Sequence, residues 1–566
     1  MNETRRTSRW IPVLFVTVLL ALVALASGGP ERVLRLASAV TREASLTDLP
    51  GFAAWSLLRM TASYLLSLAF AWWVGHAAAM NPRAARVLIP MLDVGQSVPV
   101  LGFFPAAIAL AVGLFGGGRI ALETAAIFLI FTCQSWNLAF AVYEGLSTIP
   151  AETLAAADSL GVRGVLRWRS LYIPACVPQL VYNSILSWTN GWYFLIACEI
   201  IVTGRTEVEL PGLGSLLARS FSQGNMPLYA AALAALILIV VGMEFLLWRP
   251  LRAWSQRFRY DSGVSEEDEP GGFRLPDLGI PTLLRPLRAL FRDIGERMPL
   301  AAANRVVVRT GDRLGGVWRW VRWPFWVVIG AATALSFGAV VRALLPPWPA
   351  EASKLPLALL FSFLRINAAY VLALLWIIPV ALWASDHPRG ARSLSLVAQI
   401  GASIPATAFF PFLVALLVDR FGGMEFISIG LALTGMQWYL LFNLLAGVQR
   451  VPSDLRESLR SMGLSRGQIH RHLVIPACMP SLVTGSVVAW GGTWNALILS
   501  EYVVYRHRTY EVLGVGQLLN RATFGTGNRT LLLLSVAALV TTVVAFNRLV
   551  WKRVYDAVND RYRLEA

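Results

Sequence analysis

Long apolar stretches separated by short polar segments dominate this chain. A helix needs about 20 apolar residues to cross the hydrocarbon core of a bilayer. Two sets of stretches meet this requirement, the first at 10–28, 57–79, 86–115, 120–144, 172–202 and 227–249 and the second at 323–345, 356–384, 393–418, 422–446, 473–503 and 529–549. Residues 250–322 contain an acidic run and Arg-rich segments with Pro and Gly, which are typical of a solvated linker. The pattern predicts an all-α polytopic membrane protein with domains at 1–249 and 323–566 and a linker at 250–322.

The composition agrees with a membrane protein. The chain has 566 residues, of which 56% are hydrophobic and 14% are charged, whereas about a quarter of a soluble globular chain is charged. A net charge of +16 suggests basic cytoplasmic loops rather than a nucleic-acid partner. The four cysteines lie in apolar stretches without CxxC spacing, so we expect them to be buried. The N-terminal stretch looks like a signal sequence, and we expect it to be an uncleaved first transmembrane helix.

The two sets of spans are copies of each other. LYIPACVPQLV at 171–181 and LVIPACMPSLV at 473–483 belong to a longer match. Several residues between Leu58 and Pro105 are identical to the residues 306 positions later. From the fourth span to Gly214, several residues are identical to those 302 positions later. Six spans return the chain to its starting side of the membrane. The halves are therefore predicted to be a parallel repeat rather than an inverted one.

Arginines in short loops predict the orientation. Arg5, Arg6 and Arg9 precede the first span, Arg83 and Arg86 follow the second, and the loops after the fourth span of each half are rich in arginine. These loops, both termini and the linker are predicted to be cytoplasmic. The opposite side also carries arginines in residues 32–42, so the bias is not complete.

The loop after the fourth span has the same layout in both halves. It runs STIPAETLAAADSLGVRGVLRWRSLYIPACVP in the first half and QRVPSDLRESLRSMGLSRGQIHRHLVIPACMP in the second. Each sequence predicts a short helix, a glycine break and a second amphipathic helix. Pro150 and Pro452 suit the first helical turn, and Gly161 and Gly463 suit the residue after a helix end. An ordinary helical hairpin would share this layout, but in both halves the proline of the next span lies 13 positions after the glycine.

This pattern resembles the EAA loop, Glu-Ala-Ala-x3-Gly-x9-Ile-x-Leu-Pro, of permease subunits in bacterial ABC importers. The resemblance covers both halves apart from the linker. The stretches LPGLGSLLARS and YEVLGVGQLLNRA are most similar to the nitrate/sulfonate/taurine group. The resemblance implies a fused double permease with two tandem six-helix domains of the type I importer fold. It also implies an extracytoplasmic substrate-binding protein and two ATPase subunits or domains, which would bind ATP and Mg in place of this chain.

The resemblance further implies that the loops 145–171 and 447–473 are coupling helices, which dock on the ATPases and switch the pore between inward-open and outward-open states. The positions that it assigns to ATPase coupling are Glu152, Ala155, Asp158, Gly161, Pro174, Asp454, Glu457, Gly463 and Pro476.

The two loops depart from the family pattern in different ways. In the second half Glu457 holds the family's Glu position, while Ser458 and Leu459 replace the alanines. In the first half both alanines are present, but Ala155 replaces the Glu. Members of the family are expected to pair this Glu with a basic residue of the ATPase. The first half would lack that contact unless Glu152 or Asp158 substitutes, so the two loops are predicted to be unequal.

No motif for catalysis is present in the sequence. A phosphate-binding loop needs Gly-x4-Gly-Lys-Ser/Thr, and the two lysines, Lys354 and Lys552, lie outside any such motif. Neither the zinc-protease motif H-E-x-x-H nor the nucleophile motif G-x-S-x-G occurs. We therefore predict no catalytic residue and no metal site in this chain.

Polar residues inside the spans are candidates for the transport pathway, because such residues are unfavourable in hydrocarbon unless they have a role. They can also be contacts between helices or interfacial anchors. The candidates are Asp93, Ser97, Gln134, Asn137, Trp188, Trp192, Gln399, Ser403, Gln437, Trp490, Trp494 and Asn495. Glu199 and Glu501, near the outer end of the fifth span of each half, are expected to remain solvated.

Two other functions fit the span pattern. A twelve-span secondary transporter driven by an ion gradient would also have parallel six-span repeats, although Asp93 is its lone candidate for proton coupling. A membrane scaffold that moves no solute is the other alternative. The resemblance suggests a small oxyanion such as nitrate, a sulfonate or bicarbonate as the substrate, but the sequence does not identify it.

Overall fold

The computed structural model describes residues 45–97, 99–100, 107, 111, 114–115, 119–203, 206–258, 345–409, 412–413, 423–449, 451–505, 508–522 and 526–562. The predicted first span at 10–28, the predicted span 323–345 apart from its last residue, and linker residues 259–322 lie outside this set.

The first half is a succession of long helices with short elements between them. Its elements are η1 (Leu46–Asp48), α3 (Leu49–Met80), α4 (Pro82–Ser97), α6 (Arg119–Ser147), α7 (Ala151–Ser159), α8 (Gly164–Arg167), η3 (Trp168–Tyr172), α9 (Ile173–Glu199), β1 (Ile200–Thr203), β2 (Thr206–Glu209), α10 (Leu213–Ser222), α11 (Met226–Met243), η4 (Glu244–Trp248), α12 (Arg249–Ser255) and η5 (Gln256–Phe258).

The second half repeats this order. Its elements are η6 (Ala350–Lys354), α16 (Leu355–Asp386), α17 (Pro388–Ser403), η7 (Ala406–Phe409), α19 (Met424–Gln449), α20 (Ser453–Ser461), α21 (Arg466–Ile469), η8 (His470–Val474), α22 (Ile475–Ser500), β3 (Tyr502–Tyr505), β4 (Arg508–Glu511), α23 (Val515–Asn520), α24 (Arg529–Phe546), η10 (Asn547–Trp551) and α25 (Lys552–Tyr562). The duplication seen in the sequence is thus a duplication of structure.

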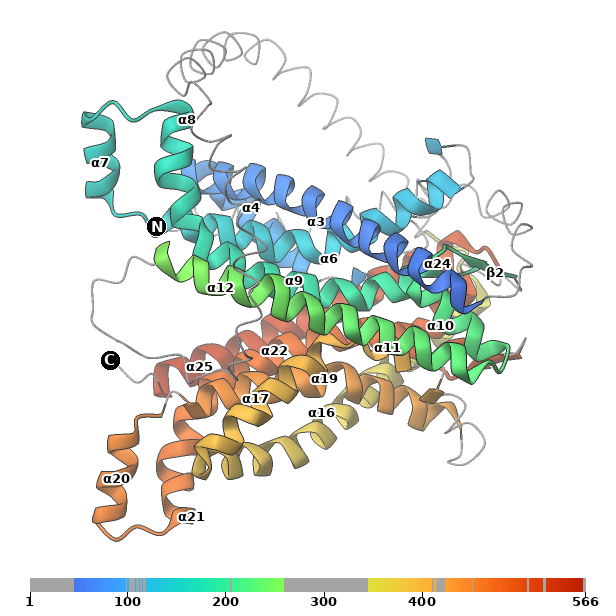
Figure 1. Cartoon of the computed structure of the whole chain (residues 1–566). Coiled ribbons are helices and arrows are strands. Elements are labelled where there is room, and N and C mark those ends of the chain that lie inside the picture. Colours follow the sequence, from blue (N-terminus) through green and yellow to red (C-terminus); the bar gives the residue numbers. More distant parts are fainter. Residues whose placement is uncertain are drawn as a thin grey trace.

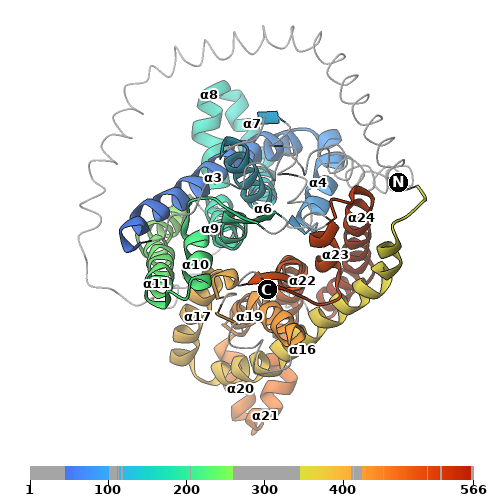
Figure 2. The same cartoon turned by 90° about the vertical axis from the view of Figure 1, so that its right-hand side faces the viewer.

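Each half packs around its middle helix. In the first half α6 lies against α3 and α9, and in the second half α19 lies against α16 and α22. Seen along the bundle, the first half lies above the second, with α4 beside α24 and α11 near α17 (Figure 2). Across this boundary the Tyr229 hydroxyl donates a hydrogen bond to the carbonyl oxygen of Ala408 at 2.9 Å. One large apolar cluster contains buried residues of both halves, so the halves share a continuous core.

The helices confirm a polytopic all-α membrane protein. In the part of the chain that the structure describes, seven helical segments are long and apolar enough to cross a membrane, namely Leu46–Met80, Arg119–Ser147, Met226–Phe258, Ala350–Asp386, Met424–Gln449, Arg466–Ser500 and Arg529–Tyr562. The four cysteines are buried and free, as the sequence predicts.

The predicted fifth spans, 172–202 and 473–503, extend too far. Helix α9 ends at Glu199 and α22 ends at Ser500, and each is followed by a two-stranded antiparallel hairpin, β1–β2 or β3–β4. The runs Ile-Ile-Val-Thr and Tyr-Val-Val-Tyr are rich in β-branched and aromatic residues, which favour strands. Apolar content alone did not separate these strands from the helices before them.

The sixth span of the first half extends beyond its predicted end at 249. Helix α11, the π-helical turn η4, helix α12 and η5 follow one another without interruption to Phe258, so the first residues of the predicted linker are helical. Helices α12 and α25, which end the two halves, both reach the end of the bundle from which α7 and α20 project (Figure 1).

Candidate functional site

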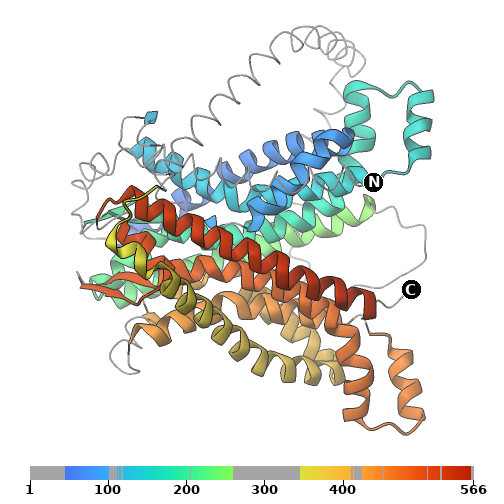
Figure 3. The same cartoon turned by 180° about the vertical axis from the view of Figure 1, so that it is seen from behind.

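Two helical hairpins project from one end of the bundle. We call Ala151–Tyr172 (α7, α8 and η3) the first α-hairpin and Ser453–Val474 (α20, α21 and η8) the second α-hairpin. They lie at the same end on opposite sides of the molecule, whereas the β-hairpins lie at the other end (Figures 1 and 3). The structure therefore brings the two related loops to one face, as a partner with two docking sites would need.

Glycine ends the first helix of each α-hairpin. Gly161 has φ +69° and Gly463 has φ +82°, in the left-handed region where glycine is favoured. The amide of Gly161 donates to the carbonyl of Asp158 at 3.1 Å and that of Val162 to Ala157 at 2.9 Å. Gly463 and Leu464 make the equivalent bonds, so both ends are Schellman motifs. This confirms the predicted glycine break; Pro150 and Pro452 lie one residue before the helix rather than in its first turn.

The predicted ATPase-coupling residues of α7 and α20 are exposed. This holds for Glu152, Ala155, Asp158, Gly161, Asp454, Glu457 and Gly463. The Asp158 carboxylate is already paired with Arg167 at 2.5 Å within the first α-hairpin. Of the two acidic substitutes considered for the missing Glu at position 155, Glu152 is therefore the one whose carboxylate is better placed to meet a partner.

Each α-hairpin also has an exposed apolar residue at its apex. Leu160 is 79% exposed and Met462 is 72% exposed, each just before the glycine. Sequence reasoning missed both, although their position before a repeated glycine marks them. A single exposed apolar side chain needs no explanation, but here both copies of the repeat keep one at the same position.

Prolines occur where each α-hairpin joins the next long helix. Pro174 and Pro476 are half-buried, and each follows a π-helical turn, η3 or η8. Proline lacks an amide hydrogen and cannot complete the helical bonding pattern. The repeated IPAC motif therefore corresponds to a change of helical winding between the α-hairpin and the membrane helix.

At the other end of the bundle, a cluster of buried charges joins four elements of the first half. The Arg59 guanidinium on α3 binds both oxygens of Glu123 on α6, at 2.5 and 2.8 Å, and donates to Glu199 at 2.9 Å. Glu199 also accepts from the Ser56 hydroxyl at 2.5 Å and from the amide of Gly214 on α10 at 2.6 Å. We call these residues the first buried charge cluster.

The second half repeats the cluster with Ser362, Arg365, Glu425, Glu501 and Gly516, although the Glu425 side chain is 55% exposed where that of Glu123 is 17% exposed. Arg365 binds Glu425 at 2.6 and 2.7 Å and Glu501 at 2.7 Å. Glu501 accepts from Ser362 at 2.6 Å and from the Gly516 amide at 2.7 Å. A Cβ atom at Gly212 or Gly514 would overlap the carboxylate of Glu199 or Glu501. The Gly-x-Gly of LPGLG and VLGVG thus lets the backbone close over a buried carboxylate.

The expectation that Glu199 and Glu501 remain solvated is wrong, because both side chains are 0% exposed. A carboxylate can be buried when an ion pair and hydrogen bonds replace its hydration. Arg59 and Arg365 supply that pairing. The sequence shows that the two arginines repeat at a shift of 306 residues and the two glutamates at a shift of 302. It does not show that the arginine and the glutamate of each half contact each other.

The predicted pathway residues fall into several environments. Asp93 is exposed on α4, and Gln96 donates to Asn137 at 2.9 Å. Gln437 is half-buried on α19 and Asn495 is buried on α22. Ser97, Gln399 and Ser403 belong to α4 and α17, but their side chains are outside what the structure describes. Gln134 is buried on α6, and its amide nitrogen contacts the Met60 sulfur at 3.7 Å.

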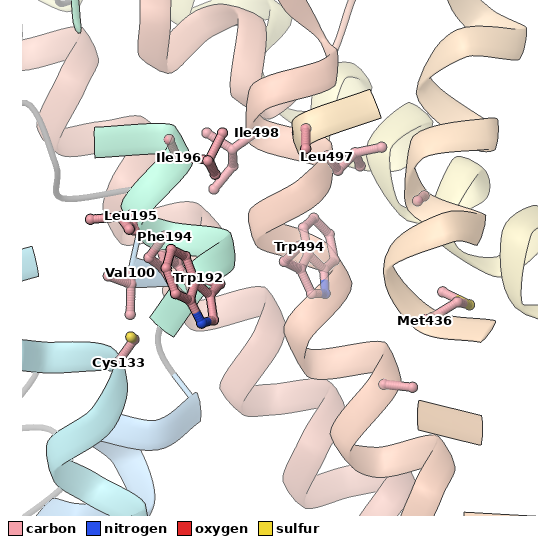
Figure 4. Close-up of a cluster of buried hydrophobic side chains, with 14 of the residues drawn as sticks. Val100, Cys133, Trp192, Phe194, Leu195, Ile196, Met436, Trp494, Leu497 and Ile498 are labelled. Atoms are coloured by element: carbon pink, nitrogen blue, oxygen red, sulfur yellow. The ribbon is translucent and has the colours of Figure 1, made fainter. Parts of the chain in front are cut away.

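The four tryptophans of the fifth spans are buried. Trp188 packs against Tyr64 and Trp248 in its own half, with ring centroids 5.5 and 5.8 Å apart. Trp490 stacks on Phe546 at 4.4 Å in the other half. Trp192 and Trp494 belong to the core cluster that the halves share (Figure 4). The indole N–H groups of all four lack a hydrogen-bond partner within the described residues.

Comparison with known proteins agrees with the duplicated structure. The model of the family described as "Binding-protein-dependent transport system inner membrane component" matches residues 67–248 and, a second time, residues 353–563. The two matches correspond to the two halves of the repeat, which confirms the predicted fusion of two related units.

Individual relatives match one part of the chain. The taurine transport system permease protein of Escherichia coli is 28% identical over 203 residues, which are 36% of this chain and 67% of that protein. The nitrate import permease protein of Synechocystis sp. is 28% identical over 112 residues, or 20% of this chain and 39% of that protein. The putative aliphatic sulfonates transport permease protein of Escherichia coli is 30% identical over 114 residues, which are 20% of this chain and 42% of that protein.

Proposed function

Since this chain belongs to the family of binding-protein-dependent transport system inner membrane components, in two tandem copies, we propose that its halves together form one translocation pathway and that two ATPase subunits or domains dock on the two α-hairpins. The observation that carries this proposal is the pair of α-hairpins, which project from the same end with the predicted coupling residues exposed. If only one ATPase docked, one α-hairpin would be enough, and the second copy on the opposite side would have no partner.

We propose that ATP and Mg are bound by those partners. Both lysines of the chain lie outside any phosphate-binding motif, so this sequence offers no site for nucleotide hydrolysis. An extracytoplasmic binding protein would deliver the solute at the opposite end, which carries the β-hairpins and the buried charge clusters.

The end with the α-hairpins is the proposed cytoplasmic side. Arginine-rich segments gather there, and helices α12 and α25 bring the start of the linker and the last described residues to the same end. We propose that domains at 1–249 and 323–566 are joined on this side by the linker at 250–322, whose first residues, to Phe258, continue the last helix of the first half.

A small oxyanion is the proposed class of substrate. The names of the relatives refer to taurine, nitrate and aliphatic sulfonates. The buried indole N–H groups of Trp192 and Trp494 are donors without acceptor capacity, and they lack partners among the described residues. Such donors suit the acceptor oxygens of a nitrate or sulfonate group.

The unequal α-hairpins lead to the first prediction. Glu457→Ala should lower transport-coupled ATP hydrolysis by about tenfold or more, because truncating one partner of a charge pair at an interface leaves the other charge unpaired. Glu152→Ala should lower it by less than about threefold, because Glu152 is not at the family's Glu position. The measurement is ATPase activity of the reconstituted complex, stimulated by the loaded binding protein.

The control for this prediction is copurification of the ATPase with each variant, since both residues are exposed and neither change should disturb folding. Equal losses from the two variants, or no loss from Glu457→Ala, would contradict the predicted inequality.

The pathway can be tested by labelling. In a background without the four native cysteines, single cysteines at Ser97, Ser403, Trp192 and Trp494 should react with a water-soluble maleimide in at least one nucleotide state. Trp192 and Trp494 are buried here, so we expect their reactivity to change between states. Cysteine at Leu238, which is 73% exposed at the middle of an apolar helix, should face lipid and stay unreactive. Unreactive pathway sites in every state would show that the solute crosses elsewhere.

A further inference from the structure

The two α-hairpins are attached to the membrane helices by different chemistry, and we propose that Asp386, at the end of α16, is the positioning residue of the second α-hairpin. The family relationship does not predict this difference, because both α-hairpins occupy the same place in the repeat. The assignment of the α-hairpins to ATPase coupling rests on the proposed function, whereas the attachment itself does not.

The second α-hairpin buries Ile469 and Val474 in the large apolar core and adds ionic and hydrogen-bonding contacts to the membrane helices. Arg456 donates to the carbonyl oxygens of Ser385 and, at 2.9 Å, of Val448. His470 Nε2 lies 3.2 Å from one carboxylate oxygen of Asp386, and Arg460 approaches the other at 3.8 Å. We call Ser385, Asp386, Arg456, Arg460 and His470 the polar anchor.

Asp386 is the centre of the polar anchor. Its carboxylate lies within ion-pair distance of two side chains that belong to α20 and η8, the first and last elements of the second α-hairpin. The side chains of Asp386 and His470 are only 18% and 19% exposed, whereas that of Arg460 is 53% exposed. Partial burial strengthens such a contact relative to a pair on the open surface.

The first α-hairpin contacts the end of α3 through aromatic and apolar side chains. Trp168 stacks on His76 at 4.7 Å between ring centroids and lies 5.3 Å from Trp72 and 5.8 Å from Tyr172. Leu154 packs into the same cluster. We call Trp72, His76, Leu154, Trp168 and Tyr172 the aromatic anchor.

The two anchors use corresponding positions of the repeat. At a shift of 302 residues Leu154 corresponds to Arg456, Asp158 to Arg460 and Trp168 to His470, and at a shift of 306 Met80 corresponds to Asp386. Asp158 bonds to Arg167 inside its own α-hairpin rather than to the membrane helix. Each polar position of the second anchor therefore has an apolar or differently paired counterpart in the first.

Loss of the Asp386 charge should affect only the polar anchor. Added salt weakens ion pairs, exposed ones more than partly buried ones, whereas contacts between apolar rings depend on the area removed from water. Loss of the Asp386 charge should loosen the second α-hairpin and leave the first in place. A loosened α-hairpin would transmit less of an ATPase movement to α16.

Spin labels at the two apices can test the proposal on the full-length chain in lipid nanodiscs without any ATPase. A label at Met462 reports on the second α-hairpin and a label at Leu160 on the first. Asp386→Asn should raise the mobile fraction of the label at 462 by about fivefold, the upper end of the range for losing a partly exposed ion pair. The label at 160 should not change. Asp386→Glu should restore the immobile spectrum, and Trp168→Ala should mobilise only the label at 160.

Salt dependence is a second measurement, and it does not require that a variant with a changed Asp386 still folds. Raising the ionic strength from about 0.05 M to about 1 M should mobilise the label at 462 more than the label at 160, because the aromatic anchor stays in place even when the Asp158–Arg167 pair is screened. An unchanged label at 462 in both Asp386→Asn and high salt, or equal responses of both labels, would overturn the proposal. If mobility changes as expected while ATPase stimulation in the full complex stays the same, the anchor stands and the coupling role of the α-hairpin fails.

Discussion

Arg59→Leu and Arg365→Leu are each expected to lower the free energy of unfolding by about 3–5 kcal/mol, the range found when one partner of a buried ion pair is removed. In either variant a glutamate, Glu199 or Glu501, would remain at a position that is 0% exposed, without its guanidinium. The same change would remove the arginine's bonds from α3 or α16 to the glutamates of the fourth and fifth spans of its half and leave only the Ser56 or Ser362 bond to Glu199 or Glu501. Thermal unfolding of the purified protein in lipid nanodiscs is the measurement.

Arg119 is the matched control for Arg59. Its guanidinium also pairs with Glu123, at 3.4 Å, but its side chain is 52% exposed. Arg119→Leu should therefore change stability by less than about 0.5 kcal/mol, as is usual for an exposed pair one helical turn apart. Equal shifts of the unfolding temperature for Arg59→Leu and Arg119→Leu would show that the buried charge cluster contributes no more than a surface pair.

The chain by itself is expected to show neither ATP hydrolysis nor concentrative uptake in lipid vesicles. The reason is that it lacks a phosphate-binding loop while it projects two α-hairpins suited to separate ATPases. Addition of the ATPase that copurifies with the chain, with the binding protein present and ATP inside the lumen that represents the cytoplasm, should restore uptake. Release of phosphate and accumulation of radiolabelled nitrate, taurine or a sulfonate are the two measurements.

An imposed ion gradient provides the opposing test. A secondary transporter would accumulate solute under a proton or sodium gradient without ATPase, and this result would overturn the proposed mechanism. Vesicles that contain the Glu457→Ala chain serve as the matched control, because their lipid environment and protein content are the same. They should show reduced ATP-driven uptake and, like the unaltered chain, no response to the gradient.

The sequence by itself determined the class and the internal symmetry of this protein. Apolar stretches of membrane length predict a polytopic helical protein, and the matching of Trp192 with Trp494 and of Gly161 with Gly463 predicts a duplicated unit. Local chemistry explains this success, because a left-handed residue after a helix favours glycine wherever the helix lies. The structure confirms the glycine break in both α-hairpins.

Only the tertiary structure showed which side chains meet. Arg59, Glu123 and Glu199 are separated by 64 and 76 residues, and their contact depends on how three helices pack. Apolar content also did not reveal where α9 changes into β1, since buried strands and helices contain similar residues. Nor did the repeat show that Asp386 and Met80, at one position of the unit, take part in different contacts. Such differences depend on neighbours distant in sequence, and those neighbours come together only when the helices assemble.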